Sequence, residues 1–435
     1  MKHPTYKRYK KSGLPYVDKI PSHWEVRRLK YIFREVTDTG YPDLELLSMV
    51  SGQGVVRQSD TGRKDRSSED RNSYKRIQKG DLGYNVMNAF MGSIGFSDYD
   101  GILSPAYAVG RPLIDICHQY FDFLFRTPMC LIEFDRYSYG IMYERNRLYF
   151  ENFAKISVPI PPIEEQKAIA RYLDRKLAEI DLFIQNKQRL IELLKEQKAA
   201  LIDRAVTKGI DDGVRMRLSG VEWVDEIPEC WEVKRVKNLI KFITSGSRGW
   251  SEYCSDDSQN PLFLQSGHLG DNLNVDLRSP QYVSPPIGAE GERGIIKQYD
   301  ILICITGAKT GNVAIVRDPL PTAYINQHVA LVRPYLFKID FRFLGYFLKS
   351  SVGSVQFLMS QYGGTKPGLS FNDVKDIIAF CPPLHEQNEI ADFLDAKTLE
   401  IESLISKQQQ EIELIQEYQV KIISDAVTGK IYLQD

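Results

Sequence analysis

Two segments of this chain are each written twice. Residues 13–28 (GLPYVDKIPSHWEVRR) return as residues 220–235 (GVEWVDEIPECWEVKR), at an offset of 207 positions. Residues 161–170 (PPIEEQKAIA) return as residues 382–391 (PPLHEQNEIA), at an offset of 221. Such self-similarity indicates one structural unit repeated within one chain. Because the offset grows between the two segments, the second unit is 14 residues longer than the first.

Each Pro-Pro pair predicts the start of a long helix, because proline is tolerated in the first helical turn and disfavours helical geometry in the residue before it. Apolar residues then recur at heptad positions a and d, which is the pattern of a helix that packs lengthwise on another helix. The expected seam residues are Leu173, Ile180, Ile184, Ile191, Leu194 and Leu201 in the first copy, and Leu394, Ile401, Ile405, Ile412, Ile415 and Ile422 in the second.

Polar residues interrupt both seams at the same two repeat positions, Lys187 with Gln408 and Lys198 with Gln419. Single polar seam residues fix the register of paired helices at some cost in stability. Two such helices in one chain most simply pair with each other, each about 65 Å long at 1.5 Å per residue. The polar segment after the first helix leads into the second unit, so we expect antiparallel pairing with a globular head at either end. In the alternative, each seam packs on its own head, although core helices seldom exceed about 25 residues.

The globular segments are expected to be mixed α/β heads. Runs rich in β-branched residues and bounded by Gly, Pro and Asn predict short strands, and Arg111-Pro112 is answered by Arg333-Pro334. Trp24 and Trp231 recur in the same frame, which predicts core side chains. The expected strands are 80–87, 106–109, 299–305, 312–316 and 328–332, and the expected helices are 121–126 and 341–349.

The fold class that we predict is therefore α+β, with a pseudo-twofold internal repeat. Two mixed α/β domains are separated by two long antiparallel coiled-coil helices. The expected segments are a first globular domain (1–160), a first spacer helix (161–206), a linker (207–218), a second globular domain (219–381) and a second spacer helix (382–435).

Composition excludes several classes of protein. With 43% hydrophobic and 26% charged residues, the chain is neither disordered nor collagen-like. It shows no signal peptide and no run of 18 apolar residues, so we expect a cytoplasmic protein without a membrane span. The cysteines form no C-x-x-C pair, which argues against a zinc ribbon and predicts small buried side chains in a reducing compartment. They are Cys117, Cys130, Cys230, Cys254, Cys304 and Cys381.

Charge is distributed unevenly along the chain. Residues 1–160 hold 24 basic and 19 acidic residues, whereas residues 382–435 hold 4 basic and 11 acidic residues. A basic surface favours nucleic-acid binding through counterion release. The first segment could therefore contact a polyanion, and the last segment could not.

No enzymatic motif is present, so we expect no catalytic residue, no cofactor site and no metal site in this chain. Gly307–Gly311 lacks the spacing of a phosphate-binding loop and predicts a β-turn. Asp225, Glu232 and Lys234 form a nuclease-like set that could hold Mg²⁺. The first repeat has Arg27 where Lys234 stands, and an arginine cannot act as a base. An autonomous Mg²⁺-dependent nuclease therefore stays only as an alternative, beside a DNA-free coiled-coil adaptor.

Both heads carry polar and basic side chains that could contact DNA. Arginine can read guanine, glutamine can read adenine, and lysine or threonine can position the phosphates. The candidates are Arg63, Lys64, Arg66, Tyr143, Arg145 and Arg147 in the first head, and Arg248, Gln265, Lys309, Gln327, Thr365 and Lys366 in the second.

The duplicated Ile-Pro-x-x-Trp-Glu-Val and Pro-Pro-x-x-Glu-Gln segments resemble the specificity subunit of type I restriction-modification enzymes. The resemblance also rests on residues 300–303 (DILI), 324–327 (YINQ) and 364–365 (GT), and it covers essentially the whole chain. It implies that each head is a target recognition domain that reads half of a bipartite double-stranded DNA site through the major groove. Because the heads differ in sequence, the full site is expected to be asymmetric.

The same resemblance implies partners. The paired helices would form a spacer that docks the methyltransferase (modification) subunit in two copies, with a restriction subunit as a further partner. S-adenosylmethionine, ATP and Mg²⁺ are implied for those subunits and not for this chain. The chain itself would be the non-catalytic recognition subunit of a system for DNA methylation and restriction.

Overall fold

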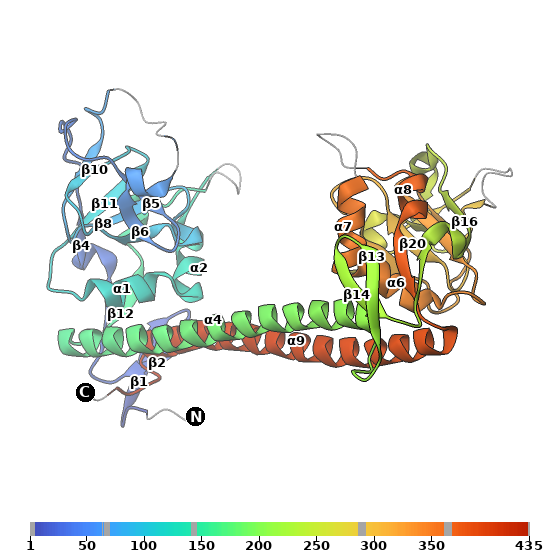
Figure 1. Cartoon of the computed structure of the whole chain (residues 1–435). Helices are drawn as coiled ribbons and strands as arrows, with labels where there is room; N and C mark the ends of the chain where they lie inside the picture. Colours follow the sequence, from blue (N-terminus) through green and yellow to red (C-terminus); the bar gives the residue numbers. More distant parts are fainter. Residues whose placement is uncertain are drawn as a thin grey trace. The chain divides into compact units, whose positions relative to one another are not determined.

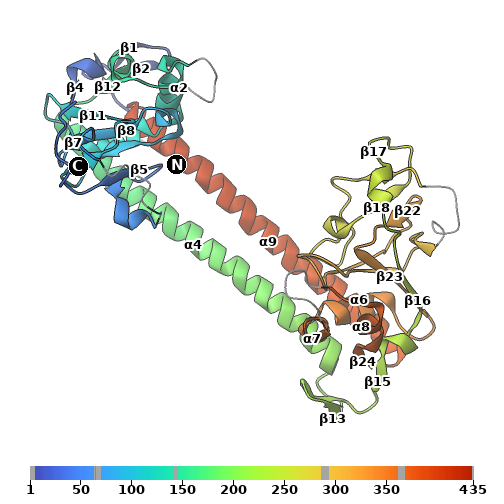
Figure 2. The same cartoon turned by 90° about the horizontal axis from the view of Figure 1, so that it is seen from above.

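The structure, a computed structural model, describes residues 5–62, 64, 70–140, 146–285, 293–360 and 368–433 (Figures 1 and 2). The chain divides into two compact units, unit 1 with residues 1–188 and 409–435, and unit 2 with residues 189–408. Each unit holds a globular head and parts of both long helices. We call residues 5–160 head 1 and residues 209–381 head 2.

The elements of head 1 are β1 (Tyr9–Leu14), β2 (Val17–Pro21), β3 (Glu25–Arg28), the 3₁₀ helix η1 (Leu29–Tyr31), β4 (Phe33–Glu35), β5 (Leu47–Val50), β6 (Gly54–Arg57), η2 (Gln58–Thr61), β7 (Lys75–Ile77), β8 (Leu82–Asn85), η3 (Ala89–Met91), β9 (Ile94–Phe96), β10 (Gly101–Leu103), β11 (Tyr107–Pro112), α1 (His118–Phe125), α2 (Pro128–Tyr137), α3 (Phe150–Phe153) and β12 (Ser157–Ile160). The first long helix, α4, is Ile163–Lys208.

The elements of head 2 are β13 (Met216–Val221), β14 (Val224–Pro228), β15 (Glu232–Arg235), η5 (Val236–Asn238), β16 (Ile240–Ser245), η6 (Trp250–Tyr253), β17 (Cys254–Ser255), β18 (Leu262–Leu264), η7 (Ser266–His268), β19 (Tyr282–Val283), β20 (Ile301–Cys304), β21 (Val313–Ile315), β22 (Ala323–Ile325), β23 (Val329–Pro334), α6 (Phe341–Lys349), α7 (Ser351–Ser360), α8 (Phe371–Asp376) and β24 (Ile378–Cys381). The second long helix, α9, is Leu384–Val427.

Each head contains its own four-stranded antiparallel sheet, and the two sheets have the same topology. The strand order is β4-β11-β8-β9 in head 1 and β16-β23-β20-β21 in head 2. The two strands in the middle of each sheet are those that the sequence predicted, as are α1 and α6 beside the sheet. The predicted internal repeat and the mixed α/β character of the heads are thus confirmed.

The heads differ in their remaining strands. Head 1 adds two separate two-stranded sheets, β5-β6 and β10-β7, whereas head 2 adds a second four-stranded sheet of order β17-β19-β18-β22. In this second sheet β18 and β22 run parallel, with Leu262 opposite Ala323. The shared sheet therefore carries different outer structures in the two heads.

Each head closes on itself just before its long helix begins. The strand that follows Ile-Pro-x-x-Trp pairs with the strand that precedes Pro-Pro, so that β3 lies against β12 and β15 against β24. Glu25 is opposite Ile160, and Glu232 is opposite Cys381. The two repeated sequence segments of each head are therefore neighbours in space.

A left-handed glycine follows the end of both long helices. Gly209 follows α4 with a φ of 77°, and Gly429 follows α9 with a φ of 74°. Glycine adopts this conformation without strain and commonly ends helices. As a result α4 extends two residues past the expected boundary at residue 206, and α9 stops at Val427 although the expected segment ran to residue 435.

The long helices pair antiparallel within each unit (Figures 1 and 2). In unit 1, Lys187 Nζ lies 2.7 Å from Glu411 Oε2, and the Gln419 amide donates to Asp181 at 3.4 Å. In unit 2, Lys198 Nζ lies 3.2 Å from Glu402 Oε1. Partner numbers fall on α9 as they rise on α4, which confirms the antiparallel prediction. Polar seam residues meet polar partners across the pair.

All twelve expected seam residues are at least partly shielded from solvent. The buried ones are Leu173, Ile180, Ile191, Leu394, Ile401, Ile412 and Ile422. The half-buried ones are Ile184, Leu194, Leu201, Ile405 and Ile415.

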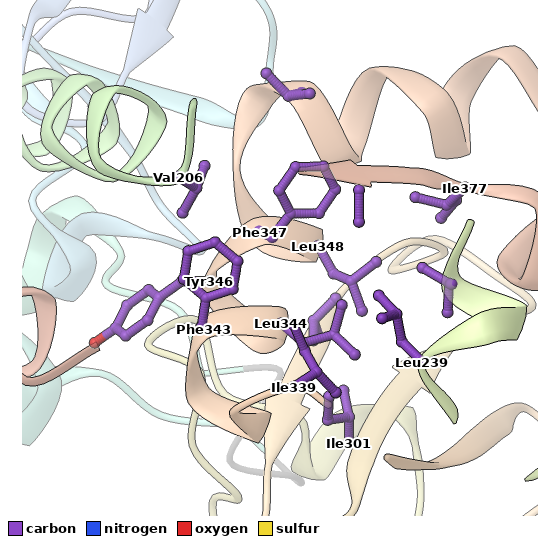
Figure 3. Close-up of a cluster of buried hydrophobic side chains, with 14 of the residues drawn as sticks. Val206, Leu239, Ile301, Ile339, Phe343, Leu344, Tyr346, Phe347, Leu348 and Ile377 are labelled. Atoms are coloured by element: carbon purple, nitrogen blue, oxygen red, sulfur yellow. The ribbon is translucent and has the colours of Figure 1, made fainter. Parts of the chain in front are cut away.

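The ends of the helices also join the cores of the heads. In unit 2, Val206 of α4 packs with Phe343 and Phe347 of α6, and Leu239 completes this cluster (Figure 3). In unit 1, Leu173 of α4 and Ala426 of α9 belong to the core of head 1. Helix pairing and head packing are therefore combined in each unit.

The predicted burial of the cysteines is only partly correct. Cys130, Cys304 and Cys381 are buried and Cys117 is half-buried, but the remaining two are exposed. Cys230 lies in the loop before β15, where head 1 has His23, and Cys254 lies at the start of the short strand β17. The buried side chains nearby in the sequence are instead Trp231 and Trp250.

Candidate nucleic-acid interface

The glutamate of each Pro-Pro-x-x-Glu-Gln segment holds the repeated tryptophan. Trp24 Nε1 donates to Glu165 Oε2 at 2.9 Å, and Trp231 Nε1 donates to Glu386 Oε1 at 3.0 Å. Both tryptophans are buried, as predicted, so each indole N–H needs such an acceptor. The sequence showed both motifs recurring in the same frame but did not reveal that they bind each other.

The glutamine of the same motif holds the beginning of the head's sheet-covering helix. Gln166 Oε1 accepts the Cys117 N–H at 2.9 Å, and Gln387 Oε1 accepts the Asp340 N–H at 2.8 Å. Cys117 and Asp340 are the residues that precede α1 and α6. Each amide also donates to the carbonyl of the first proline of its motif, Pro161 or Pro382, at 2.9 and 2.8 Å. The motif therefore fixes the position of each head on its helix.

An ion pair between a partly exposed arginine and a buried aspartate explains the repeated Arg-Pro dipeptide. Arg111 makes two hydrogen bonds of 2.8 Å to Asp81, and Arg333 donates to Asp300 at 2.7 and 2.5 Å. The hydrogen bonds to Asp81 raise the pKa of Arg111. Burial raises the pKa of Asp300, and Arg333 opposes this effect. The pairs join the two middle strands of each sheet, β11 with the turn before β8 and β23 with the turn before β20.

Some DNA-contact candidates of head 1 lie outside the described residues, namely Arg63, Arg66, Tyr143 and Arg145. Lys64 is exposed. Arg147 is exposed and donates to the Tyr149 hydroxyl at 3.3 Å. The Tyr149 ring lies 5.5 Å from the ring of Tyr139, which is also exposed. Arg147 thus belongs to a small group with two accessible aromatic rings.

In head 2, Thr365 and Lys366 lie outside the described residues, and the other four candidates are dispersed. Arg248 is exposed just before η6, and Lys309 is exposed in the β20-β21 loop. Its neighbours Gly307 and Thr310 form the predicted turn, closed by a 3.0 Å backbone hydrogen bond. Gln327 is half-buried, and its side-chain oxygen has no hydrogen-bond partner among the described residues.

Two adjoining hollows bring Gln265 and Lys309 together with an arginine that the sequence analysis missed. One hollow, of about 570 Å³, is lined by Gln265, His268 and Gln281 among others. The other, of about 720 Å³, is lined by Lys309, and Arg278 lines both. The exposed Arg278 side chain is clamped by Asp276 at 2.5 Å, and these hydrogen bonds lower the pKa of Asp276 to about 2. The only sequence signal was an aspartate two residues before an arginine.

The hollows present the donors and acceptors that base reading needs. The His268 Nδ1 accepts the Gln265 N–H at 2.9 Å while its Nε2 faces the Ser279 carbonyl at 3.1 Å, which assigns the proton to Nε2. The Gln265 side-chain amide donates a hydrogen bond to the side-chain oxygen of Gln281, which fixes the orientation of the Gln265 amide. An amide and a held guanidinium are the side-chain groups that pair with adenine and guanine edges.

The nuclease-like set shows no such organisation. Lys234 pairs with Glu232 on β15, and Asp225 is an exposed residue of β14. Among the residues that the structure describes, no three His, Cys, Asp or Glu side chains gather closely enough to hold a metal ion.

The comparisons with known proteins agree with the repeat. The family model described as "Type I restriction modification DNA specificity domain" matches residues 21–193 and again residues 228–414. The chain belongs to this family of DNA specificity subunits. It is 26% identical to the putative type I restriction enzyme MjaX specificity subunit of Methanocaldococcus jannaschii, over 95% of both chains. It is 25% identical to the EcoBI specificity subunit of Escherichia coli, over 64% of this chain and 59% of that one.

Solved structures share the fold. A chain from a study of complex assembly and conformational transition of the type I restriction-modification system matches with a TM-score of 0.72 at 16% identity. The match covers 95% of this chain and 99% of that chain. The HsdS subunit of Thermoanaerobacter tengcongensis matches with a TM-score of 0.57 at 16% identity, over 95% and 98% of the two chains.

Membership of the family settles the class of function. The specificity subunit is the non-catalytic DNA-recognition part of a type I restriction-modification system, and cofactors belong to its modification and restriction subunits. The alternatives of an autonomous nuclease and of a DNA-free adaptor are therefore set aside. No helix in the described part of this specificity subunit is long and apolar enough to cross a membrane.

Proposed function

We propose that this specificity subunit reads a bipartite, asymmetric DNA site, one half with each head. The observation that carries the proposal is one sheet topology bearing two different outer structures. The sheet that both heads have in common supports the two reading surfaces in the same way. The outer strands and loops, which differ between the heads, make those surfaces different. Since half-sites add their binding energies when linked, the pair discriminates far better than either head alone.

In head 2, the reading surface is the pair of hollows around Arg278. Gln265 and Arg278 contact base edges there, and Lys309 contacts a phosphate. In head 1, Arg147 and the rings of Tyr139 and Tyr149 form a reading surface between α2 and α3, with Lys64 on the phosphates. Arg63, Arg66, Tyr143, Arg145, Arg248, Gln327, Thr365 and Lys366 stay as further candidates.

The heads differ in charge as well as in shape. Residues 209–381 hold 18 basic and 19 acidic residues, whereas residues 5–160 hold 23 basic and 19 acidic residues. Binding by head 1 therefore depends more strongly on phosphate contacts and on salt than binding by head 2.

We propose that the helix pair docks two copies of the methyltransferase subunit, with a restriction subunit as a further partner of the complex. Four of its exposed apolar residues recur at repeat positions, whereas others, such as Leu182 and Leu190, have the polar counterparts Ser403 and Glu411. Phe183 and Leu404 are equivalent at the offset of 221, as are Leu193 and Leu414, and all four are exposed. Antiparallel pairing brings Phe183 near the level of Leu414 in unit 1, and Leu193 near the level of Leu404 in unit 2. We call these two pairs the helix patches.

The helix patches are equivalent between the units, which is why they support two copies of one partner. Large apolar side chains at corresponding exposed positions mark an interaction surface when they recur in this way. Leu399, another exposed leucine of α9, has Ala178 as its repeat counterpart and belongs to neither patch.

The reading function is tested by footprinting the complex of this chain with its methyltransferase partner. We expect two protected DNA segments separated by unprotected base pairs. Arg278→Ala should change base preference in one segment, and Arg147→Ala in the other. One continuous footprint, or a change in both segments from a single substitution, would contradict the proposal.

Docking is tested by native mass spectrometry of the same complex. The double variant Phe183→Ser with Leu414→Ser should bind one methyltransferase copy fewer. The double variant Leu193→Ser with Leu404→Ser should do the same. The control Leu399→Ser should retain two copies. Full occupancy in both patch variants would refute the assignment of the docking surface.

A further inference from the structure

The same backbone hydrogen bond recurs at the base of each head. The Leu113 N–H donates to the Ile32 carbonyl at 2.7 Å, and the Tyr335 N–H donates to the Leu239 carbonyl at 2.9 Å. In both heads the bond ties the loop after the sheet's second strand, β11 or β23, to the short helix η1 or η5. The loop then leads into α1 or α6, whose start the motif glutamine holds.

In unit 1 this junction exposes apolar surface. The Tyr31 side chain at the end of η1 is 58% exposed, and Leu113 in the loop is 50% exposed. The Lys30 ammonium lies 4.8 Å from the centre of the Tyr31 ring. We call Lys30, Tyr31 and Leu113 the base patch of head 1.

In unit 2 the corresponding junction exposes the same chemical groups from different positions. Phe337 is 72% exposed and Leu336 is 46% exposed, both in the loop. Lys338 Nζ lies 5.6 Å from the Phe337 ring centre and bonds the Asn238 carbonyl. Asn238 stands at the repeat position of Tyr31, so the aromatic ring here comes from the loop instead of the short helix. Leu336, Phe337 and Lys338 form the base patch of head 2.

Both base patches rest on a firm support. Ile116 and Ile339, the residues beneath the two loops, are buried, and Ile339 lies in the cluster with Leu239 and Leu344 (Figure 3). The Lys338 carbonyl also accepts the Gln387 amide at 3.3 Å. The apolar side chains are therefore presented by a fixed backbone and are not the exposed part of a loose loop. An aromatic ring, a leucine and a lysine on such a base have the composition of a protein interface.

DNA fits the base patch of head 2 poorly. In the strand and short helix that lead to Asn238, Arg235 and Lys237 both pair with Asp376, at 2.8 and 3.1 Å. A phosphate backbone selects clustered unpaired cations, whereas the base patches offer one lysine beside two apolar groups. That composition complements an apolar surface with a nearby carboxylate.

We infer that each base patch is a contact for the methyltransferase subunit, one copy per head, with the ring and the leucine in an apolar depression and the lysine facing a carboxylate of the partner. The inference rests on the proposed docking of two methyltransferase copies and adds a second attachment point to it. Because the base patch belongs to the head itself, it ties the partner to the domain that reads the DNA. The occurrence of the same groups in both repeats, from different sequence positions, is what one partner present twice requires.

The experiment measures methyltransferase binding to the full-length chain by native mass spectrometry over a concentration series. The variants are Tyr31→Ser with Leu113→Ser, Leu336→Ser with Phe337→Ser, and all four together. Controls replace exposed apolar residues elsewhere on the heads, Ile132→Ser on α2 and Leu358→Ser on α7. Circular dichroism checks that every variant is folded.

We expect each double variant to bind one copy normally and the second at least tenfold more weakly, and the fourfold variant to bind both copies weakly. Normal binding of two copies by all base-patch variants would overturn the inference. If helix-patch variants lost partner copies in the same assay, the proposed docking would stand without the base patches. Lower DNA affinity of the free chain, with normal methyltransferase binding, would assign the base patches to DNA and also overturn the inference.

Discussion

Replacing Gln387 by alanine tests the fastening of head 2 to its helix. The side chain is buried, accepts the Asp340 N–H at 2.8 Å and donates to the Pro382 carbonyl at 2.8 Å. Gln387→Ala would leave the buried Asp340 N–H and Pro382 carbonyl without a partner, and would also remove the 3.3 Å bond to the Lys338 carbonyl. Each unsatisfied buried group costs about 1–3 kcal/mol. Alanine regains only a few tenths of a kcal/mol through its helix propensity.

We expect the free energy of unfolding of unit 2 to fall by about 3 kcal/mol, which is roughly a 100-fold change in the unfolding equilibrium. Hydrogen exchange followed by mass spectrometry resolves the two units, whereas a single unfolding midpoint does not describe a chain of several domains. Peptides from β23 to α6 should lose protection by roughly that factor. Peptides from head 1 should keep theirs.

Two matched variants make the result specific. Gln166→Ala removes the equivalent bonds in unit 1, to Cys117 and Pro161, and should lower protection in head 1 instead. Gln410→Ala replaces an exposed glutamine of α9 and should change neither head. Equal hydrogen-exchange protection of head 2 in the Gln387→Ala and Gln410→Ala variants would refute this prediction.

Three further predictions concern reading, pH and spacing. Arg278→Ala should lower discrimination at one base pair by about 1–3 kcal/mol, while Lys309→Ala should weaken binding to all sequences and reduce the salt slope by about 1, both measured by DNA titration at several salt concentrations. Burial raises the pKa of Asp122 to about 6 from an ordinary 3.8, so its stabilising contribution is full below about pH 4 and is lost as the pH rises through 6. The melting temperature of Asp122→Asn relative to the parent should therefore be higher at about pH 8 than at about pH 4, and an unchanged difference would contradict the burial argument. Inserting one heptad into each long helix should lengthen the unread DNA between the half-sites by about three base pairs, from about 10 Å of added helix, and an unchanged gap in the footprint would exclude the spacer role.

Patterns of regular period were read correctly from the sequence. The Pro-Pro pairs marked the beginnings of α4 and α9 to within two residues, because proline acts on its own local geometry. The heptad positions identified residues that are shielded in the structure, because they follow from helical period alone. The helix ends were placed less well, since the left-handed glycines at 209 and 429 act together with the packing around them.

Candidate DNA contacts were the least predictable part. Gln265 and Lys309 were chosen separately, and only the fold brings each of them to the hollows beside Arg278. Arg278 carried only the weak signal of an aspartate two residues before it, because its role depends on its hydrogen bonds to Asp276 and on its neighbours in the hollows. Surface side chains obey no period, and their grouping depends on loop conformation.

The sequence by itself determined that this chain is one fold written twice with two long helices, because duplication and heptad spacing are properties of residue order. Only the tertiary structure decided what the repeated motifs do. The indoles of Trp24 and Trp231 find their acceptors 141 and 155 residues away, in Glu165 and Glu386. Such bonds depend on which segments fold side by side, and that depends on burying all of their apolar neighbours together and not on any local pattern.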